Sequence, residues 1–223
     1  MRGIRITTVL AMQRNGATNM TKKEDYAFVL DFLSNGKPGE ARKQPIAQVV
    51  GESYFTLLEL VLLPGKEVSP QDRVFIGKGE RESVDQIRGR INYIQLTNVA
   101  QAELPKIVSQ IVKEREAEFV AFVNKAGPIN IRAHALELLP GIGKKHLEEI
   151  LKQRESKPFE SFADVAARVT HLGDPVEIFV NRVLEELKDE QKYYLFTRGP
   201  AEEHEEGRHF EHRDDRYGSR PRY

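Results

Sequence analysis

A short stretch at residues 139–145, the glycine turn, is the feature that most constrains how this chain folds. It lies between two segments with helical apolar spacing. Pro140 and Gly141 end the first segment, because proline lacks an N–H for the helical ladder and glycine accepts a positive φ. Gly143 lets the chain turn at once into a second helix, expected over residues 144–154. The pattern predicts a bend that exposes unpaired N–H groups at a helix N-terminus, which bind phosphate without a side-chain charge.

The same bend carries positive charge. Lys144 and Lys145 directly follow Gly143 and add Coulomb attraction to a nucleic-acid strand. The alternative interpretation is a tight turn whose only role is to pack two helices against each other.

The segment around the glycine turn resembles the helix-hairpin-helix motif of proteins that bind nucleic acids without sequence specificity. The resemblance rests on residues 129–131, 135–143, 147, 150–151, 154, 157–159, 161–162 and 164–165. It implies that the turn binds a backbone phosphate. In tandem domains of this kind a second hairpin follows, and here residues 170–174 take its place. They lack the paired glycines, so a phosphate-binding role is not assigned to them.

Composition excludes several classes of protein. The chain has 223 residues, 39% of them hydrophobic, which supports a buried core with room for unstructured ends. It has no cysteine, which excludes disulfides, thiolate metal sites and cysteine nucleophiles. No apolar run reaches the length of a membrane span. We therefore expect a cytoplasmic protein with no membrane association, no metal site and no cofactor.

The net charge is zero, since 34 basic and 34 acidic residues cancel. A basic field over a whole domain, the usual footprint of a nucleic-acid binder, is therefore missing. This counts against tight binding to long duplexes, but it leaves room for a local site built from backbone amides and a few lysines and arginines.

The N-terminal half predicts a small β-barrel. Residues 1–22 are expected to be a disordered extension, with Met20 as a candidate start. Residues 23–96 are expected to form an OB-like barrel, because short apolar runs alternate with turn signals. Its five strands are predicted at residues 26–33, 45–51, 54–63, 73–77 and 91–94.

The C-terminal half switches to helical periodicity. Residues 97–127 are expected to hold connecting helices, with Thr97-Asn98 as a candidate cap at the start. The first helix is expected to be short, with Pro105 in its first turn, and the second to be long and to reach Asn124. Residues 128–190 are expected to form an all-α helix-hairpin-helix domain. A short apolar segment (191–198) and a disordered charged tail (199–223) complete the fold class, which is α+β with more than one domain.

Four basic residues in the barrel segment are candidates for a second phosphate contact: Lys78, Arg81, Arg88 and Arg90. OB folds bind oligonucleotides over a basic groove, and these residues are expected to line one mouth of the barrel. The alternative is an ordinary barrel loop, since nearby acidic residues partly cancel the charge.

Other polar residues favour structural interpretations. His134 and His146 flank the turn and are expected on half-exposed helix faces rather than as metal ligands. Asp164 follows the hairpin at a distance comparable to the catalytic aspartate of some DNA glycosylases. The simpler interpretation places it in the first turn of a short helix, where its charge suits the helix dipole.

The ordered part of the chain, about residues 25–196, also resembles DUF655, an archaeal family of unknown function. The resemblance rests on residues 26–31, 73–79, 87–93 and 103–105 and on the hairpin itself. It implies an OB-like barrel joined to a helix-hairpin-helix domain, and binding to RNA or nucleotides. It implies no catalytic activity.

The sequence therefore predicts a nucleic-acid-binding protein, largely insensitive to sequence, with RNA favoured over DNA. The residues expected to contact nucleic acid are Pro140, Gly141, Ile142, Gly143, Lys144, Lys145, Lys78, Arg81, Arg88 and Arg90. One alternative is a protein-interaction scaffold, which the zero net charge favours. The other is a glycosylase- or nuclease-like enzyme, for which Asp164 is the only candidate residue.

Overall fold

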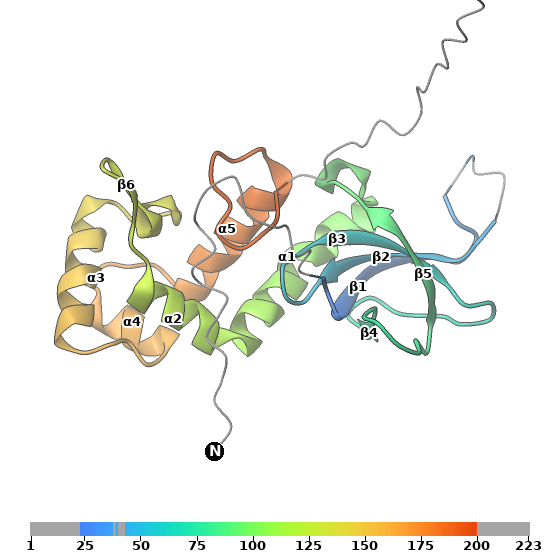
Figure 1. The fold of residues 1–223 in the computed structure, drawn as a ribbon, viewed down its shortest axis with the longest axis horizontal. Helices are drawn as coiled ribbons and strands as arrows, with labels where there is room; N and C mark the ends of the chain where they lie inside the picture. Colours follow the sequence, from blue (N-terminus) through green and yellow to red (C-terminus); the bar gives the residue numbers. More distant parts are fainter. Residues whose placement is uncertain (1–22, 38, 40–42, 200–223) are drawn as a thin grey trace, which may run out of the picture.

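The computed structural model describes residues 23–37, 39 and 43–199. The expectations for residues 1–22 and 200–223 lie outside these described residues. Within them the chain is α+β: a curled five-stranded antiparallel sheet is followed by the helices (Figure 1). No helix in the described residues is both long and apolar enough to cross a lipid bilayer.

The sheet is antiparallel throughout and has the strand order β4-β1-β2-β3-β5. Its strands are β1 (Tyr26–Leu33), β2 (Ile46–Gly51), β3 (Leu57–Leu62), β4 (Arg73–Phe75) and β5 (Val84–Arg90). The edge strands β4 and β5 form no ladder with each other in the described part of the chain, so the sheet stays open as a half-barrel.

The first four strands lie where the sequence predicted them, and the fifth does not. β1 has the predicted bounds, because its apolar side chains are largely buried. The fifth strand was expected at residues 91–94, but it is Val84–Arg90, and Tyr93–Gln95 is a 3-10 turn, η1. β5 is an edge strand in which only Val84 is buried. Its sequence is therefore mostly polar and lacks the apolar pattern by which the other strands were predicted.

The connecting segment forms two helices in the opposite order of length to the prediction. α1 (Asn98–Glu114) is the long one and α2 (Glu116–Lys125) the short one. α1 starts earlier than Pro105 suggested because the Thr97 hydroxyl caps it, accepting the Ala100 N–H at 3.0 Å. Pro105 therefore lies inside the helix, where burial of its apolar face offsets the lost hydrogen bond.

The remaining elements form the end of the molecule that was predicted to be all-α, and that prediction is wrong because a short two-stranded sheet precedes the helices. These elements are β6 (Pro128–Asn130), β7 (Ala133–His134), η2 (Ala135–Leu138), α3 (Lys144–Ser156), α4 (Phe162–Arg168) and α5 (Pro175–Lys188).

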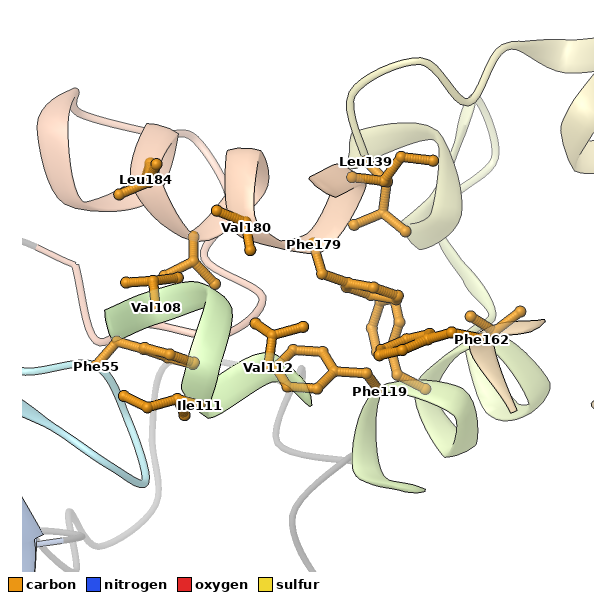
Figure 2. Close-up of a cluster of buried hydrophobic side chains, with 14 of the residues drawn as sticks. Phe55, Val108, Ile111, Val112, Phe119, Leu139, Phe162, Phe179, Val180 and Leu184 are labelled. Carbon is orange, nitrogen blue, oxygen red and sulfur yellow. The ribbon is translucent and has the colours of Figure 1, made fainter. Parts of the chain in front are cut away.

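One hydrophobic core joins the sheet to the helices. It runs from Phe28 on β1, through α1 and α2, to Leu184 on α5. Figure 2 shows its centre, where side chains of α1 and α5 face each other and the rings of Phe119 and Phe179 pack with centroids 4.9 Å apart. A second cluster fills the other face of the sheet, around Leu60. The segments at residues 23–96 and 97–190 therefore share a core instead of packing separately.

The short apolar segment after α5 is anchored to this core. The ring of Phe196 lies 5.3 Å from that of Phe119. The buried carboxylate of Glu186 accepts three backbone N–H groups of this segment at 2.7–3.0 Å: those of Leu195, Phe196 and Thr197. The same carboxylate is paired with Arg182 at 2.8 Å.

Candidate nucleic-acid interface

The glycine turn connects η2 to α3 and lies at the surface. Gly141 has a φ of +83°, a conformation that favours glycine, whereas Gly143 has a φ of −92° that any residue adopts. Between them Ile142 is 7% exposed, and its N–H donates to the Leu139 carbonyl at 3.1 Å. The buried isoleucine thus holds the turn in place while both glycines stay exposed.

The element before the turn is a single turn of 3-10 helix, η2, where the sequence predicted a longer helix. A reciprocal cap at His134 starts it: the ring Nδ1 accepts the Leu136 N–H at 3.1 Å, and the Glu137 carboxylate accepts the His134 N–H at 2.9 Å. His134 is 9% exposed, so the prediction of a half-exposed helix face is wrong for it. Burial, together with the Arg154 charge, lowers the pKa of its imidazole.

α3 begins without a side-chain cap, because its N-cap residue is Gly143. The Gly143 carbonyl accepts the Leu147 N–H at 2.9 Å. Within the described ranges no protein acceptor lies against the N–H groups of Gly143, Lys144 and Lys145. These donors therefore point to solvent, at the end of a helix where the macrodipole is positive.

Other helices of this end begin differently. The side chains of Ser161 and Asp174 cap α4 and α5, and each first turn has an acidic residue. The first turn of α3 has Lys144 and Lys145 instead; both are exposed, with no ion pair to a described residue. Positive charge there costs a few tenths of a kcal/mol in helix stability. Such a local conflict is typical of functional sites, because an incoming anion relieves it.

Around the second turn, residues 170–174, carboxylates accept the donors of Thr170 and Val176. The Glu149 carboxylate accepts the Thr170 N–H at 3.1 Å and the Thr170 hydroxyl at 2.8 Å. The Asp174 carboxylate accepts the Val176 N–H at 2.9 Å. Two carboxylates thus hold the positions that a phosphate would need, which fits the absence of paired glycines noted in the sequence.

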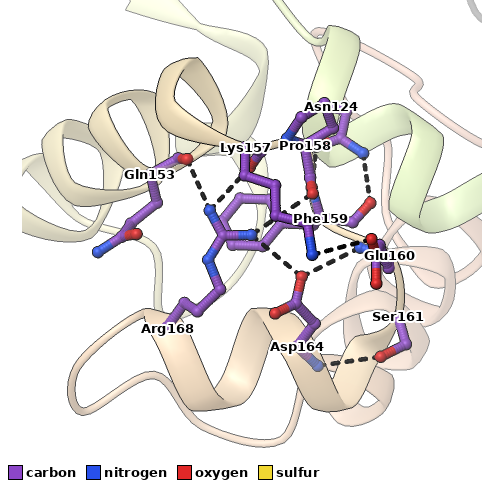
Figure 3. A network of polar contacts seen from close by, with 9 residues as sticks. All are labelled: Asn124, Gln153, Lys157, Pro158, Phe159, Glu160, Ser161, Asp164 and Arg168. Atoms are coloured by element: carbon purple, nitrogen blue, oxygen red, sulfur yellow. Dashed lines mark hydrogen bonds and ion pairs between the residues drawn. The ribbon is translucent and has the colours of Figure 1, made fainter.

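A guanidinium network joins the C-terminal end of α3 to α4, at the opposite end of α3 from the glycine turn (Figure 3). The Arg168 side chain lies over the Phe159 ring at 4.4 Å. It donates to three backbone carbonyls at 2.6–3.4 Å: those of Gln153, Lys157 and Pro158. One planar group therefore fixes the end of α3 to the start of α4.

Asp164 belongs to the same network. As predicted, it lies in the first turn of α4, where its N–H donates to the Ser161 hydroxyl at 3.0 Å. Its carboxylate accepts from Arg168 at 3.0 Å and from the Glu160 N–H at 3.1 Å. Partial burial alone would raise the pKa of Asp164, but these hydrogen bonds outweigh it and lower the pKa. The Asp164 carboxylate therefore stabilises the loop between α3 and α4.

The four basic residues of the sheet have different surroundings. Lys78 is exposed, and Arg81 donates to the Gly77 carbonyl at 3.2 Å, both in the loop from β4 to β5. On β5, Arg88 pairs with the buried Glu59 at 2.9 Å. Arg90 donates to the Gly199 carbonyl at 2.6 Å, in the segment after α5. They therefore divide between a loop and an edge strand and do not share one partner.

One known protein family matches most of this chain. The family model described as "Protein of unknown function (DUF655)" matches residues 23–198. The chain belongs to this family. The family match covers nearly all the described residues, including the glycine turn and the segment after α5. It confirms the resemblance to DUF655 and carries no description of a function.

Two archaeal relatives agree with the family. The "Uncharacterized protein MJ0038" of Methanocaldococcus jannaschii is 44% identical over 179 residues, which cover 79% of this chain and 81% of the relative. A crystal structure of Af1531 from Archaeoglobus fulgidus matches with a TM-score of 0.73 and 46% identity. The match covers 78% of this chain and the whole of that chain. The fold described here is thus similar to one seen in a crystal.

Arg198 is a charged residue that the sequence did not single out. It closes the apolar segment after α5, and its guanidinium lies 4.6 Å from the centre of the Tyr54 ring. Arg198 also lies near enough to Arg90 for its charge to lower the Arg90 pKa, after burial as the larger cause. No local pattern relates two residues so far apart in the chain, so only the fold could reveal this pair.

Proposed function

We propose that this protein binds nucleic acid through the glycine turn, largely without sequence preference, and that RNA is preferred over DNA. The observation that supports the proposal is the start of α3, where three exposed N–H groups lack protein acceptors next to Lys144 and Lys145. A phosphate diester accepts several such donors and neutralises both the dipole and the lysines. The preference for RNA follows from the resemblance to the family.

In this proposal the curled sheet is an open relative of an OB barrel, and η2, the glycine turn and α3 act as a helix-hairpin-helix unit. Lys78 and Arg81, in the β4–β5 loop, supply the second phosphate contact. Arg88 is left out because its charge already pairs with Glu59. Two modest contacts on one rigid body combine by effective concentration, which offsets the absent basic field.

The test is the salt dependence of binding to a fluorescently labelled single-stranded RNA of about 15 nucleotides, measured by fluorescence anisotropy. The variant K144Q/K145Q removes two charges from the turn. K113Q/K152Q, at two other exposed lysines, removes two charges elsewhere. Each single-strand phosphate contact contributes a slope of about −0.7 to the plot of log affinity against log salt. We expect K144Q/K145Q to reduce the slope by about 1.4. K113Q/K152Q should leave it near that of the native chain.

A second variant tests the backbone rather than the charge. A Cβ at Gly143 meets no atom within 4 Å and the φ there is permissive, so G143A should fold as the native chain does. The added methyl group lies where a phosphate would approach the N–H groups, so affinity should fall. G141A is unsuitable, because a positive φ costs a non-glycine residue about 1–2 kcal/mol.

Two results would refute the proposal: no RNA binding by the native chain at low salt, or equal slopes for both double variants. In that event the scaffold becomes the better proposal. Its support is the zero net charge of the chain. We propose no catalytic role, since the only candidate carboxylate, Asp164, is engaged by Arg168.

A further inference from the structure

A cleft of about 270 Å³ lies between the end of β5, η1, the end of α5 and the segment that follows it. Phe55, Leu57 and Tyr93 give it apolar and aromatic walls, and Arg90 and Arg198 line the same space. It is built from residues far apart in the sequence and is separate from the glycine turn.

Polar groups of this cleft lack partners. Thr56 is 5% exposed and lines the cleft, and its Oγ1 has no hydrogen-bond partner among the described residues. The same holds for the buried Thr197 Oγ1 and Arg198 Nη2. A buried polar atom without a partner carries its full desolvation cost, so three of them beside one cleft indicate a missing acceptor.

Arg90 and Arg198 form no direct ion pair with any described carboxylate, although Asp189 and Glu190 also line the cleft. Among the described residues Arg90 donates only to the neutral Gly199 carbonyl. Glu186 lines the cleft too, but its two oxygens are taken by Arg182 and by backbone N–H groups. The Arg198 charge lowers the pKa of Arg90, after burial, which is what two guanidinium groups do when no anion separates them.

We propose that this cleft binds a phosphate monoester of a small organic molecule, with the phosphate between Arg90 and Arg198. A phosphate dianion matches two guanidinium groups that have no ion-pair partner among the described residues, whereas a carboxylate neutralises only one. Its oxygens accept from Thr56, Thr197 and the free Arg198 Nη2. One water occupies about 30 Å³, so a cleft of about 270 Å³ has more room than an inorganic phosphate needs. The aromatic wall receives the organic part of the ligand.

The experiment is isothermal titration calorimetry on the full chain with three probes at matched ionic strength: inorganic phosphate, adenosine 5′-monophosphate and adenosine. We expect the monophosphate to bind more tightly than inorganic phosphate, and adenosine to bind weakly or not at all. R198Q should lower the affinity for the monophosphate by about tenfold or more, since it removes a charged donor. R132Q, at an exposed arginine on the β6–β7 hairpin, serves as the control.

Thr56→Val gives an independent readout. If the hydroxyl lacks a protein partner, the variant should melt at or above the temperature of the native chain while binding the monophosphate more weakly. K144Q/K145Q should bind the monophosphate unchanged, so this proposal and that for RNA can fail separately. No phosphate-dependent heat in the native chain would overturn the assignment. Equal affinities of R198Q, T56V and R132Q would do so as well.

Discussion

Glu186 ties the last described segment to the helices, and its replacement gives a sharp prediction. Its side chain is fully buried, and that of Arg182 is 6% exposed. Glu186→Gln keeps the shape and one oxygen. It removes the negative charge beside Arg182 and turns one acceptor into a donor that faces N–H groups of residues 195–197.

The expected cost follows from these contacts. Removing one partner of a buried ion pair costs about 3–5 kcal/mol, because the other charge stays buried without compensation. The free energy of unfolding of a native protein is roughly 5–15 kcal/mol, so this loss is a large share of the stability. Phe196 belongs to the aromatic core, so release of the segment also removes packing against Phe119.

The control is Glu185→Gln on the same helix. The Glu185 carboxylate is 3.7 Å from Arg182 and its side chain is 46% exposed, so its loss should cost less than about 1 kcal/mol. Urea denaturation followed by circular dichroism gives both values. Limited proteolysis should cut E186Q after α5 before it cuts E185Q. Equal urea midpoints for the two variants would refute the reasoning.

Two further predictions concern the Arg168 network at the end of α3 and the His134 cap before the glycine turn. Arg168→Lys keeps the charge but cannot reach the separate acceptors of the guanidinium, so it should cost about 1–3 kcal/mol in urea denaturation. Arg132→Lys, at an exposed site, should be neutral, and equal losses would argue against the network. Burial lowers the pKa of His134, so its neutral form stabilises the fold; this contribution is present above about pH 6.5 and is lost as the pH falls toward the lowered value. His134→Asn, which keeps an acceptor for the Leu136 N–H, should lose less stability between about pH 7 and 5, and an identical pH dependence in both chains would contradict this.

Elements with strong local signals were predictable from the sequence. β1 is a run of aromatic and branched residues bounded by turn residues, and its bounds were predicted correctly. The start of α3 at Lys144 follows from Gly143, since the glycine decides locally where the helix begins. The exposed bend of the candidate interface was predictable for the same reason.

Features that depend on tertiary contacts could not be predicted from the sequence. β5 has only one buried residue and pairs through its backbone, so apolar patterning placed the fifth strand too late. Pro105 suggested a late helix start, but a cap at Thr97 and contacts with β1 extend α1 past it. The pairing of Arg88 with Glu59 and the approach of Arg198 to Arg90 need the folded sheet, and no spacing in the chain encodes either.

The core that continues from the sheet through α1 to α5 has a mechanical consequence. Because no flexible joint separates the β4–β5 loop from the start of α3, the distance between these two surfaces is set by the packing of the molecule. A polynucleotide that touches both must bridge a constant gap. The protein would then act as a ruler, with a minimum length of strand below which only one end can be held.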